Sequence, residues 1–527
     1  MKKLLKLTLF IIVGFLYSCS KDLLDVANPN TPTSQVFWKT ENDATLGLNA
    51  VYHAFYAGGT WQLNMFFRND LTSDEGWSNS PALDLAEYTR FIYSDYNDYN
   101  ENSQIWKYHY KAILRANLVI ANVPNITFTD ESKKKDIIAQ AKFLRGFYYF
   151  YLAILYENVP LVLNPSNAGD APKQNTLTEV FTQCIEDFTE AAADLPATRA
   201  STDLGRATKG AALAYLGKVN MQMGNWQAAK DAFYWLIEGD GAINYGLMDN
   251  YRDNFKHTTE NNKESVFEIQ FSDVNQVFAG LYGISNDIPS SNVGCARAQY
   301  FGIKGIGWCD AQPRRWILDE YYKEPNATGG LDIRLRDNFF YPNLQTDFPG
   351  EKIYGQDWSV LKWGSNTVTS NYWRKYQNDY WRTYENNYSP INYRTIRYAD
   401  VLLCYAECLA QLNTTPPALA IQCVNRVRQR KEVNLLPLES SIYANVCTDK
   451  TLFLNRLKVE RSLELCGETV RWIDLKRWKP WNDPTEWAAL LVRDPDFNNF
   501  VNGKSERLPI PQLEVDNNPN LTQNYGY

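Results

Sequence analysis

Two blocks of the chain carry apolar residues at the three- and four-residue spacing of an amphipathic helix. Residues 136–156 are apolar nearly all round in their second half, which predicts a buried helix that ends before Pro160. Residues 106–123 predict a helix with one apolar face. That face consists of Tyr110, Ile113, Leu114, Asn117, Leu118 and Ala121.

Residues 206–238 follow the rhythm of a tetratricopeptide hairpin. The small positions are Ala211, Ala214 and Gly217, and a break at Gly224 leads into a second helix. Small residues let two antiparallel helices approach closely, while larger apolar residues fill the space between hairpins. A second such unit spans residues 398–430, with a Thr/Pro turn at 414–417. Because single hairpins cannot bury their faces, we predict a mostly α-helical scaffold over residues 36–238 and 391–480.

Residues 239–390 lack this periodicity and are dense in Gly, Asn, Asp, Trp and Tyr. Residues 265–274 predict a short strand, whereas the aromatic stretches 300–316 and 370–388 predict ordered loops. Because binding residues are often carried by loops on a rigid scaffold, we expect a binding region at 239–390. We expect residues 481–527 to be a C-terminal extended segment that packs on the scaffold.

The first residues have the pattern of a secretory signal. Three lysines precede residues 7–16, an apolar run of about ten residues, which is short of the ~20 needed to span a membrane. Cys19 directly follows the small residue Ser18, and residues 16–19 look like a bacterial lipobox. We therefore predict a signal peptide at 1–18, lipidation of Cys19 and an N-terminal tether at 19–35. The alternative is an ordinary signal peptide with an incidental cysteine.

Composition narrows the class of ligand. Removing residues 1–18 takes away three lysines and no acidic residue, so the formal net charge goes from −7 to −10. This charge, without any basic run, argues against nucleic acid and other polyanions as partners. The 16 Trp and 34 Tyr outnumber the 25 Phe, so most aromatic side chains carry a polar tip that suits half-exposed, ligand-facing positions.

Eight cysteines follow Cys19, and an exported chain could form disulfides. Cys295 and Cys309 flank a Gly-rich aromatic segment, and a bridge between them would stabilise that loop by ~3 kcal/mol. Sequence leaves this pairing open. The other cysteines are expected to be small buried apolar residues. The three histidines lie at no ligand spacing from any cysteine, so we expect no metal site.

Taken together, several long motifs resemble the SusD/RagB family of surface lipoproteins from Bacteroidetes. They are the lipobox with Ser20-Lys21-Asp22 and Asp25 behind it, and residues 37–55, 141–162, 206–238, 396–413, 460–478 and 508–527. The resemblance implies a SusD-like helical fold and a ligand site built from loops. It also implies an outer-membrane, lipid-anchored protein on the cell surface that acts as the lid of a SusC-like TonB-dependent transporter. Members capture glycans or, in some cases, peptides.

Candidate ligand-binding residues come from side-chain chemistry. Trp308 and Tyr300 stand in the loop between the two cysteines, and Trp77 follows a polar cluster that includes Asp70. An aromatic face beside hydrogen-bonding groups is what a neutral sugar ring needs. For each candidate, core packing or contact with the transporter is the alternative. The full candidate set is Asp70, Trp77, Cys295, Tyr300, Trp308, Trp358, Trp363, Arg374 and Tyr398.

No catalytic motif is present. The sequence contains no Gly-rich phosphate loop, nucleophile elbow or HExxH motif, and no pair of carboxylates is singled out for glycoside hydrolysis. We therefore expect a binding protein without cofactor, which takes a neutral oligosaccharide, a fructan or an α-glucan. The alternative is a peptide-capturing protein of the same fold.

The tether hypothesis is tested by the substitution Cys19→Ala. Because the thiol of Cys19 would carry the acyl chains, the variant should remain a precursor without lipid label when cells are grown with a fatty-acid analogue. A variant that is still lipidated and surface-exposed would refute the hypothesis.

Overall fold

Long helices occupy both blocks in which the sequence predicted them. The computed structural model describes residues 37–80, 85–92, 101–167, 169–274, 293–357 and 370–527. Within these ranges the α-helices are α3 (Glu41–His53), α4 (Asn64–Leu71), α5 (Leu85–Arg90), α6 (Glu101–Asn122), α7 (Glu131–Tyr156), α8 (Leu177–Asp194), α9 (Lys209–Gln222), α10 (Trp226–Ile237), α11 (Arg297–Phe301), α12 (Arg315–Glu320), α13 (Ile333–Asn338), α14 (Leu344–Asp347), α15 (Tyr398–Gln411), α16 (Ala418–Arg428), α17 (Lys450–Leu465), α18 (Arg471–Trp478), α19 (Pro484–Arg493) and α20 (Gln512–Asn517). The mostly α-helical fold class is thereby confirmed.

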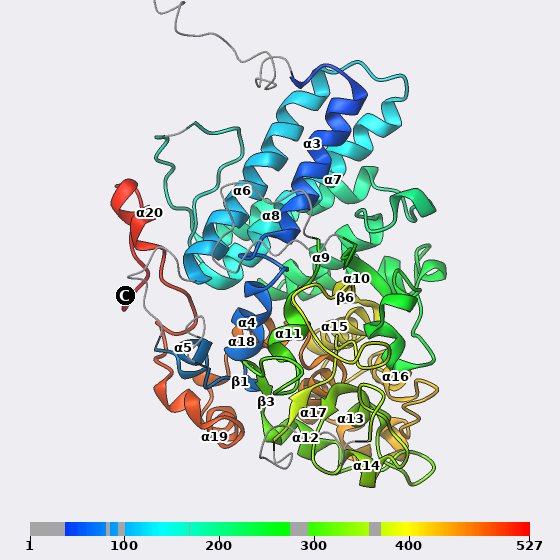
Figure 1. Cartoon of the computed structure of the whole chain (residues 1–527). Coiled ribbons are helices and arrows are strands. Elements are labelled where there is room, and N and C mark those ends of the chain that lie inside the picture. Colours follow the sequence, from blue (N-terminus) through cyan, green and yellow to red (C-terminus); the bar gives the residue numbers. More distant parts are fainter. Residues whose placement is uncertain (1–36, 81–84, 93–100, 168, 275–292, 358–369) are drawn as a thin grey trace, which may run out of the picture.

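The helix α7 forms the centre of the scaffold. All of its residues from 143 to 156 are buried, as the all-round apolar pattern predicted. It packs between α6 and α8, and α3 lies against both α6 and α7 (Figure 1). None of the helices in the described ranges is long and apolar enough to cross a membrane.

Two helical hairpins stand where the tetratricopeptide rhythm predicted them. The first is α9–α10 and the second is α15–α16, and α10 packs against α15. Gly217 explains the small-residue rule, because a Cβ placed there would lie 2.4 Å from Cζ of Phe233. Stacking of the hairpins thus joins residues that are far apart in the sequence into one body.

The middle of the chain contains short elements rather than loops alone. In the described residues, three antiparallel pairs of strands occur: β1 (Gly76–Trp77) with β3 (Gln312–Pro313), β2 (Ser265–Ile269) with β6 (Tyr393–Arg397), and β4 (Phe339–Phe340) with β5 (Tyr372–Trp373). The predicted strand within 265–274 is β2, and its partner β6 leads directly into α15. The pair β2–β6 therefore fixes the middle region to the second hairpin.

The C-terminal segment differs from the expected extended chain. It contains α19 and α20, and α19 is capped by Asp483, whose carboxylate accepts hydrogen bonds from the backbone N–H groups of Thr485 and Glu486. The segment also packs on the scaffold: the N–H of Leu508 donates to the carbonyl of Leu155 at the end of α7 (2.8 Å). In Figure 1 it runs as a red strip along one flank of the molecule.

A buried network of ion pairs connects the middle region to the helical scaffold. Its centre is Glu464 of α17, whose carboxylate lies 2.6 Å from Arg397, 2.6 Å from Arg430 and 3.0 Å from Arg334. Arg430 and Arg397 also bind Glu264, just before β2, at 2.6 and 2.7 Å. The side chains of all five residues are essentially inaccessible to solvent.

Burying these charges carries a desolvation penalty, which their mutual attraction offsets. Burial alone would raise the pKa of Glu464, but Arg430, Arg397 and Arg334 together lower this pKa to about 2. The carboxylate is therefore ionised at neutral pH and satisfied by several donors. Removing one partner from a buried pair leaves an uncompensated charge, which costs about 3–5 kcal/mol.

The variant Glu464→Gln tests this network. It keeps the size of the side chain but leaves Arg334, Arg397 and Arg430 without their shared counter-charge, so the free energy of unfolding should fall by about 3–5 kcal/mol. Urea denaturation at pH 7, followed by circular dichroism, measures the change.

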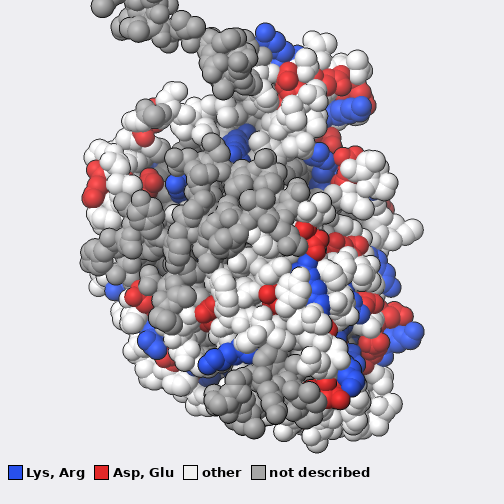
Figure 2. All heavy atoms as spheres, in the orientation of Figure 1, with Lys and Arg blue, Asp and Glu red and all other residues white. Residues whose placement is uncertain are grey.

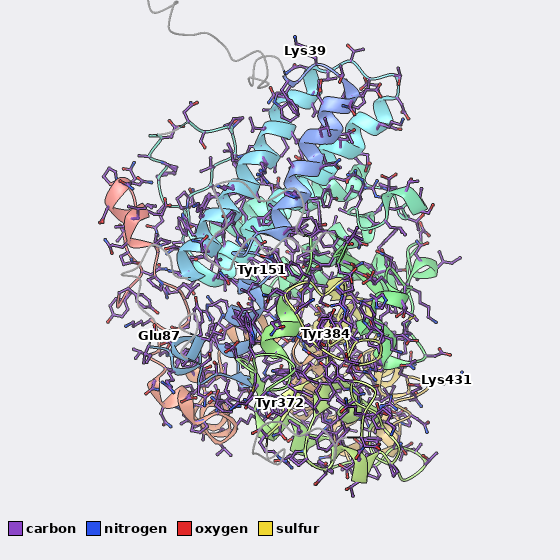
Figure 3. All side chains as sticks on the ribbon, viewed as in Figure 1. Lys39, Glu87, Tyr151, Tyr372, Tyr384 and Lys431 are labelled. Atoms are coloured by element: carbon purple, nitrogen blue, oxygen red, sulfur yellow. The ribbon has the colours of Figure 1, made fainter. Side chains whose placement is uncertain are left out.

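Lys431→Ala is the matched control, because Lys431 forms an exposed ion pair with Asp249 at 3.3 Å (Figure 3). Exposed pairs contribute at most about 1 kcal/mol. Equal losses in the two variants would contradict the proposed role of the network.

Candidate functional site

Two strands of two residues each bring together distant parts of the chain. Trp77 in β1 lies opposite Gln312 in β3, and Gly76 lies opposite Pro313. Trp77 is half-buried, and the guanidinium of Arg314 lies 5.8 Å from the centre of its ring. The strand pair therefore sets one predicted aromatic candidate beside the segment that carries the other.

Trp308 stands on a turn that leads into β3. Its backbone N–H donates to the carbonyl of Gln299 (2.7 Å), and the backbone N–H of Asp310 donates to the carbonyl of Tyr300 (2.8 Å). The indole packs edge-on against the ring of Tyr300, with centroids 4.7 Å apart, yet 47% of the residue remains exposed. Because Tyr300 fixes the orientation of the indole and part of the ring stays accessible to solvent, Trp308 is suited to stacking against a ligand.

The carboxylate of Asp310 lies on the chain between Trp308 and β3. The hydroxyl of Ser80 donates to Asp310 Oδ1 at 2.6 Å, which ties the segment after β1 to the turn before β3. Burial raises the pKa of Asp310, and the bond from Ser80 only partly offsets this effect. We call Trp77, Ser80, Trp308, Asp310 and Arg314 the Trp77/Trp308 site.

Residues 467–471 hold both sides of this site. The N–H of Thr469 donates to Asp70 Oδ1 (3.0 Å), in the helix α4 that precedes Trp77. Arg471 binds both carboxylate oxygens of Asp74, at 2.6 and 2.8 Å. On the other side, Arg297 of α11 donates to the carbonyl of Gly467 (2.9 Å). The segments that lead to Trp77 and to Trp308 are thus fastened to the same stretch of scaffold.

The carboxyl groups of this anchor differ in their electrostatics. Burial raises the pKa of Asp70 to about 6, although Arg297 and the N–H of Thr469 counteract it. Burial raises the pKa of Glu75 to about 8. Burial would also raise the pKa of Asp74, but Arg471 and Arg493 outweigh it and hold this pKa below its usual value. The upward shifts of Asp70 and Glu75 thus arise from burial, and the downward shift of Asp74 from its ion pairs inside the protein.

Several predicted candidates are buried and make contacts within the protein. Asp70 and Tyr300 support the site from beneath, as described above. Arg374 pairs with Asp379 (2.8 Å) and Glu351 (2.5 Å). The hydroxyl of Tyr398 accepts a hydrogen bond from Arg426 at 2.9 Å. Among the candidates within the described ranges, Trp77 and Trp308 retain accessible aromatic surface; Trp358, Trp363 and Cys19 lie outside the described residues.

The bridge between Cys295 and Cys309, which the sequence left open, is not formed in the structure, where both residues are free thiols. The N–H of Cys295 donates to the carbonyl of Ser389 (2.9 Å), whereas the Cys309 sulfur accepts a hydrogen bond from Gln312 (2.6 Å). Burial raises the pKa of Cys295 to about 12 and that of Cys309 to about 11, which disfavours the thiolate. The turn is held by the β1–β3 pair and Tyr300 rather than by a covalent bond.

Sequence reasoning missed the polar members of the site and two exposed aromatic residues. Ser80, Asp310 and Arg314 meet only through the β1–β3 pair, and strands of two residues leave no periodic signal. Trp381 and Tyr384 lie in the aromatic stretch 370–388, so their signal was present, but nothing in the sequence distinguished them from their buried neighbours.

The charge on the visible face is mixed. Figure 2 shows acidic and basic side chains interspersed among the described atoms, without a continuous basic patch. In the described residues no group of three His, Cys, Asp or Glu side chains could hold a metal ion. The site therefore offers indole surface and a carboxylate acceptor, while the guanidinium of Arg314 is paired with Asp494 and Asp496 at 2.6 and 2.5 Å. This combination suits non-covalent binding of a neutral, hydroxyl-rich ligand.

A groove of about 750 Å³ lies elsewhere, between α6, residues 160–167 and 169–172, and the C-terminal segment at α20. It shares no lining residue with the Trp77/Trp308 site. The hydroxyl of Tyr110, which lines it, donates to the carbonyl of Pro160 (2.9 Å) and so closes one wall. No candidate residue from the sequence lies there.

Comparisons with known proteins cover nearly the whole chain. A model described as "SusD family" matches residues 263–527, and one described as "Starch-binding associating with outer membrane" matches residues 22–221. The chain is similar to SusD-like protein P2 of Formosa agariphila, with 28% identity over 536 residues and 98% of both chains covered.

Solved structures agree with the fold. A SusD superfamily protein from Bacteroides vulgatus superposes with a TM-score of 0.77 at 26% identity, covering 93% of this chain and 100% of that one. Surface glycan-binding protein A from Bacteroides thetaiotaomicron, in complex with laminarihexaose, superposes with a TM-score of 0.71 at 20% identity, covering 92% of this chain and 100% of that one. At 20% identity, the similarity to this second structure is evidence for the fold alone.

The state of the two thiols can be measured directly. Because Cys295 and Cys309 contact different partners, denaturation with iodoacetamide and without reductant should alkylate both, as seen by mass spectrometry of the digest. A reduced sample is the control and should give the same pair of peptides. A linked peptide in the non-reduced digest would contradict the structure.

Proposed function

The chain belongs to the SusD family, and from that premise we propose that it captures a neutral glycan at the cell surface. We further propose that it delivers this glycan to a TonB-dependent outer-membrane transporter, whose lid it forms. Proteins of this family bind ligand without catalysis, in agreement with the expectation from sequence.

The Trp77/Trp308 site carries the proposal. A sugar ring presents an apolar C–H face and a rim of hydroxyl groups, and the site presents half-exposed indole rings beside Asp310, Ser80 and Arg314. The rings are fixed before the ligand arrives, by Tyr300 beneath Trp308 and by the β1–β3 pair. Pre-organised side chains lose little entropy on binding.

Charge supports a neutral rather than an acidic glycan. The mature chain has a formal net charge of −10 without residues 1–18, and the site itself contains the carboxyl group of Asp310. A polyanionic ligand would be repelled by both. The candidate ligands from sequence are an α-glucan or a fructan. The family model that matches residues 22–221 is described as starch-binding, and one similar solved structure contains laminarihexaose. These ligands are stated for that family model and that protein.

Attachment to the outer membrane is the second part of the proposal. Acylated Cys19 would anchor the protein in lipid, and residues 20–35 would link this anchor to the folded body. The matching model for residues 22–221, described as associating with the outer membrane, supports this location.

Titration calorimetry with residues 20–527 tests the ligand class. The panel contains oligosaccharides of starch, levan and laminarin, an oligogalacturonate and mixed peptides. We expect binding of one neutral glycan, and Trp77→Ala and Trp308→Ala should each weaken it about three- to tenfold, because each removes a stacking surface.

Tyr234→Ala is the control, since Tyr234 is an exposed aromatic residue of α10, in the helical scaffold. Its affinity should equal that of the wild type. Binding of peptides alone would favour the peptide-capturing alternative, and glycan binding that neither tryptophan affects would place the ligand elsewhere.

A further inference from the structure

A second aromatic surface lies on the turn that follows Arg374. Trp381 and Tyr384 keep 43% and 52% of their surface exposed, although residues 372–379 before them and Glu385 after them are buried. Figure 3 labels Tyr384. We call His257, Trp381, Arg382 and Tyr384 the Trp381 platform; it shares no residue with the Trp77/Trp308 site.

The indole of Trp381 is held in place from several directions. Its Nε1–H donates to Asn378 Oδ1 at 3.1 Å. The guanidinium of Arg382 stacks on the ring at 4.3 Å and is itself buried, paired with Asp273 and bonded to the carbonyl of Tyr388 (3.3 Å). One face of the indole thus packs on the guanidinium of Arg382, which is itself held in place. Together with the bond to Asn378, this contact fixes the orientation of the exposed part of the ring.

His257 forms the edge of the platform. Its ring lies 4.5 Å from that of Trp381, and its Nδ1 and backbone N–H both bond to the hydroxyl of Tyr380, at 2.6 and 2.8 Å. Burial lowers the pKa of His257, so the imidazole is neutral at pH 7. A neutral ring can donate or accept a hydrogen bond with a hydroxyl group.

Buried groups anchor both ends of the turn. Asp379 binds Arg252 (2.5 Å) and Arg374 (2.8 Å). At the other end, the carboxylate of Glu385 accepts hydrogen bonds from the backbone N–H and the amide of Asn378, each at 2.7 Å. The exposed aromatic residues therefore sit on a rigid part of the protein.

We propose that the Trp381 platform binds a sugar residue of the same neutral glycan chain that occupies the Trp77/Trp308 site. The inference rests on the proposed function. The charges of the platform are already satisfied, since Arg382 pairs with Asp273, and the rim groups are the neutral imidazole of His257, the amide of Asn386 and the hydroxyl of Tyr384. An indole backed by a cation disfavours a cationic ligand, so a neutral, hydroxyl-rich ring fits best.

A second platform changes how affinity depends on chain length. A polymer that reaches both surfaces gains from the higher effective concentration of its second segment, whereas a trisaccharide occupies one surface. The platform should therefore matter for the polymer and not for the shortest ligand.

The experiment uses the lipidated protein purified in detergent and compares laminarin, soluble starch and levan with their trisaccharides. Polymer affinity is measured by retardation in native gels, and trisaccharide affinity by calorimetry. Trp381→Ala should weaken the polymer about three- to tenfold and leave the trisaccharide unchanged. Trp381→Phe keeps a ring and should retain most of the polymer affinity.

Two controls frame the result. Trp308→Ala should weaken both ligands, and Tyr234→Ala neither. Unchanged polymer binding in Trp381→Ala overturns the platform while leaving the proposed function intact. Equal weakening of polymer and trisaccharide also overturns it, because Trp381 would then act through the single site or through the fold. A wild type that retains no glycan removes the proposed function, and the platform with it.

Discussion

The buried ion pairs around Glu464 are the constraint on which the rest of the structure depends. The middle region has few long elements, and Glu264 and Arg334 attach it to Arg397, Arg430 and Glu464 of the scaffold. Lys375 extends the network to Glu468 (2.7 Å), and Arg297 donates to the carbonyl of Lys375 (2.9 Å). A short series of buried contacts made by charged residues thus connects the ion pairs around Glu464 to the Trp77/Trp308 site.

This arrangement explains how weak local elements can carry a precise site. The strands β1 and β3 have two residues each and would not pair in isolation. They pair because Asp70, Asp74 and Arg297 fasten their neighbours to residues 467–471. Binding requires side chains held in the right orientation, and here rigidity comes from the scaffold while the aromatic surface comes from loops.

Periodicity made the helical part predictable, and the same reasoning could not sort the charged and aromatic residues of the middle region. The apolar pattern of 136–156 predicted α7, and the small residue Gly217 predicted the first hairpin. Both predictions were possible because a buried helix face requires apolar or small residues at regular spacing. The sequence predicts Arg374 and Asp70 as candidate ligand-binding residues, with core packing as the alternative, because a charge that is paired in the interior looks the same in sequence as one that faces solvent. The sequence left the pairing of Cys295 with Cys309 open, because loop composition cannot fix disulfide connectivity, and both are free thiols in the structure. Trp308 stays a predicted ligand-binding residue, and the contacts that support it depend on the three-dimensional pairing of β1 with β3.

The central claim is that the glycan stacks on Trp77 and Trp308. The most direct measurement is ¹⁹F NMR of protein labelled with fluorotryptophan, with signals assigned by single Trp→Phe replacements, during titration with the glycan that the protein binds. The account predicts saturable shifts of the Trp77 and Trp308 signals, while Trp226 of α10 stays unchanged. Saturable binding that leaves both Trp77 and Trp308 unmoved would contradict it.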